Sequence, residues 1–120
     1  MLDNKTSNTL DQADKLYQSA SEEYSRPEED VVPYMVCRSA YKAVDKYLTA
    51  FLMKHGIEIH NSMSIDVLLE LCRDLDTRFN DLTLDPLLTK SDNEDLWMNM
   101  DTVNDFYRLA SETRKLVAEN

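Results

Sequence analysis

The hydrophobic positions of the chain recur at helical spacing in several separate segments. In the first segment, about Thr9 to Tyr24, the apolar residues fall on one helical face: Leu10, Ala13, Leu16, Tyr17, Ala20 and Tyr24. The pattern ends before Pro27, because proline disfavours helix at the residue before it. No run of alternating apolar and polar residues is long enough to predict a strand. The pattern therefore predicts an all-α fold.

The segment from about Val32 to His55 carries the strongest helical signal. Pro33 suits the first turn of a helix, and Gly56 suits the position just after the last turn. The apolar positions cover about half of the helix circumference, wider than the ~100° stripe of an ordinary surface helix. They are Val36, Cys37, Ala40, Tyr41, Ala43, Val44, Tyr47, Leu48, Ala50, Phe51 and Leu52. We therefore expect this helix to lie at the centre of a bundle.

Two further helices are expected in the C-terminal half of the chain. The first runs from Ser64, the predicted N-cap, to Leu75 or Phe79, and the second covers about Thr102 to Ala118. Each of them carries apolar residues at intervals of three and four. Both are therefore amphipathic helices with one face turned toward the core.

The stretch between these helices, about residues 80–100, is less regular. Its leucines predict a short packed helix around Pro86, and the pair Ser91 and Glu94 has the spacing of a capping box. No repeat or interdomain linker interrupts residues 1–120. The prediction is a single domain with the fold of a four- to five-helix up-and-down bundle.

Composition narrows the possible functions. The chain has 120 residues and one glycine, whereas a Rossmann phosphate loop needs three glycines and a P-loop needs two. It also has 13 basic and 23 acidic residues, a net charge of −10, which disfavours long nucleic acids and anionic membranes. These numbers exclude the common nucleotide-loop enzymes and favour a compact acidic protein.

The two cysteines and the start of the chain bear on location. Cys37 and Cys72 have no motif spacing and both fall on apolar faces, which favours buried core thiols over nucleophiles. The first residues lack the basic start and apolar run of a signal peptide. We therefore expect a cytoplasmic protein with reduced thiols.

The charge is distributed unevenly. Residues 33–56 hold four basic residues and one acidic residue, Asp45, although the chain as a whole is acidic. Three of the basic residues are spaced four apart and are here called the basic row: Arg38, Lys42 and Lys46. The row is either a binding face for phosphate, RNA or an acidic partner, or a solvated face that forms salt bridges with neighbouring acidic helices. The second interpretation is the favoured one.

Other polar groups offer little chemistry. A metal site is conceivable at His55, Glu58 and His60, but a chance cluster in an exposed loop is the simpler interpretation. A metal-dependent hydrolase is a minor alternative that rests on three carboxylates spaced four apart, here called the acidic row: Asp66, Glu70 and Asp74. Most solvated helix faces have this spacing too. We expect no cofactor and no metal.

Three consecutive stretches carry a resemblance to a known family. The helix Cys37–Leu52, the turn Lys54–Glu58 and the segment Ser62–Leu71 resemble HEPN (higher eukaryotes and prokaryotes nucleotide-binding) domains. The resemblance covers about residues 34–75 and implies a helical bundle that is frequently dimeric.

The same resemblance makes a test of catalysis possible. In the catalytic branch of the family, an Arg followed a few residues later by a His on the last helices cleaves RNA. This chain has no histidine after His60, and Met63 stands where the family often has one. Four arginines lie beyond this point and have no following histidine: Arg73, Arg78, Arg108 and Arg114. Ribonuclease activity is therefore not expected.

Two functions follow as hypotheses. The first is a non-catalytic binding module that acts as a homodimer or with a nucleotidyltransferase-type protein, in a toxin–antitoxin or defence-like context. The second is a nucleotide- or RNA-binding protein that uses the basic row, with Tyr34 or Tyr41 available for stacking on a base. The predicted binding residues are Arg38, Lys42, Lys46 and Tyr41.

Overall fold

The computed structural model describes residues 4–59, 63–85, 87 and 99–118. These residues form helices and connecting turns, and no strand occurs among them, so the predicted all-α class is confirmed. Nor is any helix in this part of the chain long and apolar enough to cross a membrane. The elements are α1 (Asn4–Tyr24), η1 (Glu28–Asp30), α2 (Pro33–Lys54), α3 (Ile65–Leu75), η2 (Thr77–Asp81) and α5 (Met100–Ala118).

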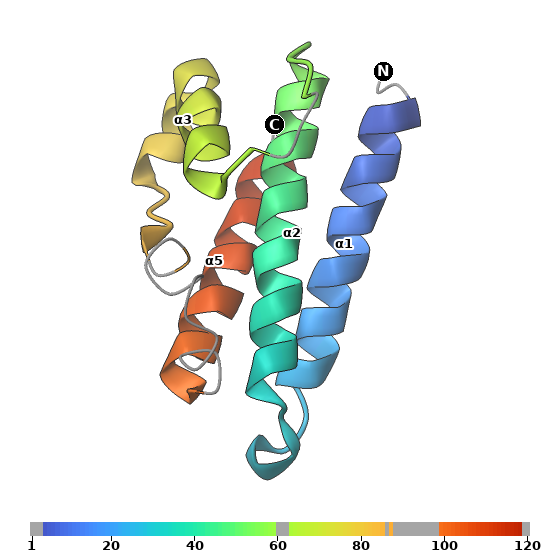
Figure 1. Ribbon diagram of the computed structural model, residues 1–120, viewed down its shortest axis with the longest axis vertical. Coiled ribbons are helices and arrows are strands. Elements are labelled where there is room, and N and C mark those ends of the chain that lie inside the picture. The colour runs from blue at the N-terminus through green and yellow to red at the C-terminus, as the bar shows by residue number, and fades with distance from the viewer. Residues whose placement is uncertain (1–3, 60–62, 86, 88–98, 119–120) are drawn as a thin grey trace.

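Helix α2 is the centre of the molecule, as its wide apolar surface predicts. It packs against α1, α3 and α5, whereas α1 and α5 contact each other much less. Figure 1 shows α1 and α2 running in opposite directions, with α5 behind α2 and α3 beside the C-terminal half of α2. The chain therefore returns from the end of α2 to the start of α5 through α3, η2 and the residues that follow them.

The core consists of the apolar faces that the sequence indicates. The largest side chains with almost no exposed surface include Tyr47, Phe51, Phe79 and Phe106. On α1 the fully buried positions are alanines, so this helix approaches α2 closely.

Both cysteines are buried, which confirms their prediction as core thiols. The Cys72 thiol donates a weak hydrogen bond to the carbonyl of Leu48, 3.8 Å away, and ties α3 to α2. Burial raises the pKa of this thiol to about 12. Cys72 is therefore protonated at neutral pH and acts as a small apolar side chain.

The start of α1 differs from its prediction, whereas the ends of α3 agree with theirs. Helix α1 begins at Asn4 rather than near Thr9, whose hydroxyl lies inside the helix and donates to the carbonyl of Lys5. Ser64 does occupy the N-cap position of α3, but its side chain accepts no N–H from the first turn. Helix α3 ends at Leu75, and Phe79 belongs to η2, where it is buried.

The irregular segment after η2 is partly described. Leu82, Leu84 and Leu87 are buried, which agrees with packed leucines in this region. Asp85 and Leu87 are helical. Pro86 and the predicted capping box lie outside the described residues.

Gly56 ends α2, as predicted. Its φ of +82° lies in the left-handed region, which side chains other than that of glycine rarely adopt. The N–H of Gly56 donates to the carbonyl of Met53 at 3.0 Å, and the N–H of Ile57 donates to the carbonyl of Leu52 at 2.9 Å. These two bonds form a Schellman motif, which satisfies carbonyls that a helix end leaves without partners.

Replacing Gly56 with alanine is expected to lower the free energy of unfolding by ~1 kcal/mol. A Cβ at this position would meet no atom within 4 Å, so the cost comes from the backbone conformation and not from a clash. The matched control is Gly56→Asn, because asparagine tolerates the left-handed region better than alanine. Urea denaturation measures both. Equal stability of the alanine variant and the parent would contradict the prediction.

Candidate functional site

The basic row lies along the outer face of α2. Arg38 and Lys42 are exposed and Lys46 is half-buried. The opposite face of the helix is filled by residues with no exposed surface, among them Val44 and Phe51. Because each step of four residues advances a helix by ~6 Å, the three cations span ~12 Å.

No member of the basic row forms a salt bridge or hydrogen bond with another described residue. The arginines that do form ion pairs in this part of the structure lie elsewhere: Arg26, Arg73, Arg78, Arg108 and Arg114. Asp45 lies close enough to Lys46 to respond to its charge. Burial raises the pKa of that carboxyl, and Lys46 partly opposes the effect. The expected salt bridges with acidic helices are therefore not found among the described residues, and the row presents its charge to solvent.

Tyr41, the fourth predicted binding residue, differs from the basic row. It is half-buried, and its ring packs against the hydrophobic core. Tyr34 has the same character. Only part of each ring is open to a stacking base, so the role of Tyr41 stays a prediction.

The histidine of the described structure has a local role at the end of α2. His55 is the C-cap residue, its Nδ1 lies 3.0 Å from the carbonyl oxygen of Phe51, and the two rings are 4.4 Å apart. His60, the other member of the predicted cluster, lies outside the described residues. In the part of the chain that is described, no group of three His, Cys, Asp or Glu residues is placed to hold a metal ion.

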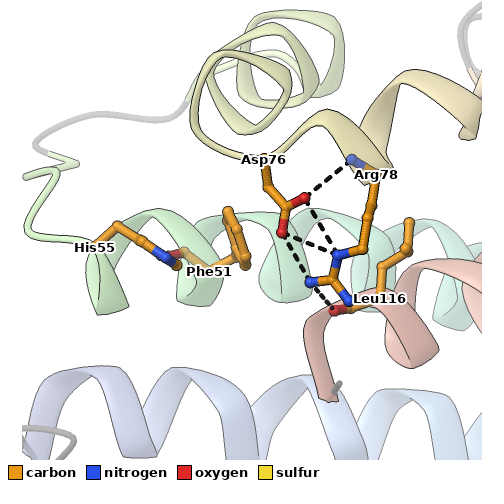
Figure 2. A network of polar contacts seen from close by, with 5 residues as sticks. All are labelled: Phe51, His55, Asp76, Arg78 and Leu116. Atoms are coloured by element: carbon orange, nitrogen blue, oxygen red, sulfur yellow. Dashed lines mark hydrogen bonds and ion pairs between the residues drawn. The ribbon is translucent and has the colours of Figure 1, made fainter. Parts of the chain in front are cut away.

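The guanidinium of Arg78 forms an ion pair with Asp76 at the start of η2 and a hydrogen bond that ties η2 to α5. Figure 2 shows the Arg78 guanidinium between the carboxylate of Asp76 and the carbonyl of Leu116. Nη2 of Arg78 lies 2.8 Å from Oδ2 of Asp76 and 3.5 Å from the Leu116 oxygen. The backbone N–H of Arg78 donates to the same carboxylate at 2.9 Å. These contacts fix the turn after α3 and leave Arg78 committed to structure.

The Asp76 carboxylate gives a pH-dependent prediction. The side-chain hydrogen bonds from Arg78, with smaller effects of its backbone N–H and of the His55 charge, lower the pKa of Asp76. A carboxyl whose pKa is lower in the folded state than its ordinary ~3.9 stabilises the fold above that value and loses the effect as the pH falls below it. Asp76→Asn should therefore lower the melting temperature at pH 7, and the difference from the parent should shrink at pH 3.

Melting curves at both pH values check this prediction, with Asp81→Asn as control because Asp81 is an exposed residue of the same turn. A difference between parent and Asp76→Asn that stays constant from pH 7 to pH 3 would contradict it.

The acidic row occupies the outer face of α3. Asp66, Glu70 and Asp74 are all exposed. Glu70 forms an ion pair with Arg73 at 2.7 Å, but Arg73 also donates to the carbonyls of Phe79 and Leu82. The row is thus an exposed carboxylate face and offers no enclosed metal site.

Sequence reasoning missed a seam of tyrosine and serine hydroxyls between α1 and α5. The rings of Tyr17 and Tyr107 stack with centroids 5.6 Å apart. The Tyr17 hydroxyl lies 2.8 Å from Oγ of Ser111, and the Tyr107 hydroxyl lies 2.7 Å from Oγ of Ser21. The available signal was the four-residue spacing of tyrosine and serine on both helices. The seam joins two helices that otherwise make few contacts.

Comparison with known proteins agrees with this fold and with the resemblance of its central helices. Searches of curated proteins and of solved structures found no match. A scan against protein families matches the HEPN domain over residues 6–119. Since the match extends from the first turn of α1 to beyond the end of α5, the chain belongs to the HEPN family.

Proposed function

We propose that this HEPN chain is a non-catalytic binding module. The observation that carries the proposal is the position of its histidines, His55 and His60, neither of which follows an arginine on the last helices. On α5, Arg108 pairs with Asp105 and Glu112 of its own helix, and Arg114 lies near Asp14 and over the Tyr17 ring. An arginine and histidine pair that would move a proton at a ribose 2′-oxygen is therefore missing from this helix.

Incubation with labelled single-stranded RNA tests the absence of catalysis. We expect no cleavage above that of a buffer sample. Arg108→Ala and Arg114→Ala should give the same result as the parent. Cleavage by the parent that either substitution abolishes would overturn the proposal.

A binding module needs a partner, and a protein partner is favoured. HEPN domains often dimerise, and the acidic surface of this chain repels long nucleic acids. We propose a homodimer or a complex with a nucleotidyltransferase-type protein, in a toxin–antitoxin or defence-like context. Light scattering over a concentration series tests the first form. A monomer at high micromolar concentration, together with no binding to a purified nucleotidyltransferase encoded beside the gene, would contradict both forms.

A second candidate function is the binding of a nucleotide or a short RNA by the basic row. It is favoured by one observation, that the three cations form no ion pair among the described residues. Titration with ATP and a short RNA at two salt concentrations tests it. Binding should weaken as salt rises and on the double substitution Lys42→Glu with Lys46→Glu. Binding that is insensitive to both would exclude the row as a nucleotide site.

A further inference from the structure

The basic row of α2 and the acidic row of α3 have the same length and the same spacing. Each has three charged residues at intervals of four, so each presents a charge every ~6 Å over ~12 Å. Charges of opposite sign at matched intervals allow three cations to face three carboxylates at once when the helices lie side by side. Within one chain the rows do not meet, because no salt bridge joins a member of one row to a member of the other among the described residues.

Exposed apolar side chains accompany both rows. The large hydrophobic residues of the described structure that remain exposed are Val32, Met35, Val67 and Leu75, with exposed fractions of 39, 52, 44 and 43%. The first two lie at the N-terminal end of α2, beside the basic row, and the other two lie on α3, beside the acidic row. Apolar residues next to complementary charges are the composition of a protein-binding surface.

A groove beside α3 provides a place where a side chain of a second copy can insert. It has a volume of about 460 Å³ and is lined by apolar and charged side chains. The apolar ones are Val67, Leu69, Leu71 and Leu84, and the charged ones are Asp66, Glu70, Arg73 and Asp85. The cation among them, Arg73, is held by Glu70 and by two backbone carbonyls. The groove therefore suits an apolar side chain that is flanked by cations, and Met35 followed by Arg38 has this chemistry.

We propose that two copies of this chain dock reciprocally, the basic row of each lying along the acidic row of the other. In a two-fold symmetric dimer such a contact forms twice, since the same pair of surfaces meets on both sides of the axis. Met35 of each copy then lies at the groove beside Val67 of the other. This inference deepens the homodimer of the proposed function by assigning its interface, and it covers the basic row in the dimer.

The size of such an interface is reasonable for this chain. A stable interface buries ~800 Å² on each partner, and the chain exposes 7018 Å². The contact would thus take about a ninth of the surface of each copy. Asp45, a carboxylate next to the basic row, is partly buried.

Charge reversal tests the pairing of the rows. In the first variant Lys42 and Lys46 become Glu, and in the second Glu70 and Asp74 become Lys. Analytical ultracentrifugation should show that each variant alone dimerises with a dissociation constant at least ~10-fold higher than that of the parent, because like charges then face each other in both contacts. An equimolar mixture should recover dimers of near-parental affinity, since both contacts again join opposite charges. A chain that carries all four substitutions should recover as well.

The matched control is Lys15→Glu with Lys115→Glu, which changes the net charge as the first variant does but alters exposed residues of α1 and α5. It should dimerise like the parent, and melting curves of all variants show that they are folded. A dimer that neither reversal weakens, or a mixture that does not recover, overturns this interface but leaves a homodimer intact. A parent that stays monomeric and binds RNA through Lys42 and Lys46 overturns it too. Cleavage of RNA bears only on the proposed absence of catalysis.

Discussion

Replacing Phe51 with alanine is expected to lower the free energy of unfolding by ~3–5 kcal/mol. Phe51 lies on the inner face of α2 and has no exposed surface. Its ring centroid is 4.7 Å from that of Phe79 in η2 and 4.4 Å from that of His55. Alanine would remove the ring and leave a cavity where the C-terminal part of α2 packs against η2.

The expected loss is a large part of the ~5–15 kcal/mol that stabilises an ordinary domain. Urea denaturation followed by circular dichroism measures it at a concentration where the parent is monomeric, so that dissociation does not contribute. Gln12→Ala, an exposed change on α1, is the control and should alter stability by less than ~0.5 kcal/mol. A cost for Phe51→Ala below ~1 kcal/mol would mean that this contact does not organise the core.

The central helix, α2, was the most predictable part of the fold. Periodic apolar residues and Gly56 placed the ends of α2 within one residue of their observed positions, because the burial of a wide face and a left-handed stop are local properties of the sequence. The start of α1 was predicted too late. Residues Asn4 to Asn8 are all polar, so the periodic signal is absent there although the helix continues.

The candidate site was predictable only as positions on helices. Spacing of four placed the basic row on one face of α2, and the structure has it there. Whether those cations form ion pairs depends on where the neighbouring helices place their carboxylate side chains. On α1, Asp14 accepts from the Tyr47 hydroxyl at 2.6 Å and Glu23 pairs with Arg26, which no local pattern indicates.

Arg73 illustrates the same limit, because its importance comes from contacts that spacing does not predict. Its Nε donates to the carbonyl of Phe79 at 3.2 Å, and its Nη2 donates to the carbonyl of Leu82 at 2.8 Å. The third contact is the ion pair with Glu70. One guanidinium thus joins α3 to η2 and to the residue after it, and fixes the part of the chain that borders the groove.

Arg73→Ala is therefore expected to lower the free energy of unfolding by ~1.5–3 kcal/mol, the range for hydrogen bonds that involve a charged group. Arg73→Lys should recover only a part, because an ammonium group cannot reproduce the planar fork that reaches two carbonyls. Urea denaturation compares both variants with the parent.

Two controls separate the carbonyl bonds from simple loss of charge. Arg108 is 57% exposed, and its ion pairs among the described residues lie within α5, so Arg108→Ala should cost ~0.5 kcal/mol or less. Glu70 is 68% exposed, so Glu70→Gln should have a similarly small effect, although it removes the negative charge from the shortest contact of Arg73. If Glu70→Gln were as costly as Arg73→Ala, the ion pair and not the two carbonyls would hold this turn. The small cost expected for Glu70→Gln follows from solvent access to its carboxylate, whereas the carbonyls of Phe79 and Leu82 belong to residues buried in the core.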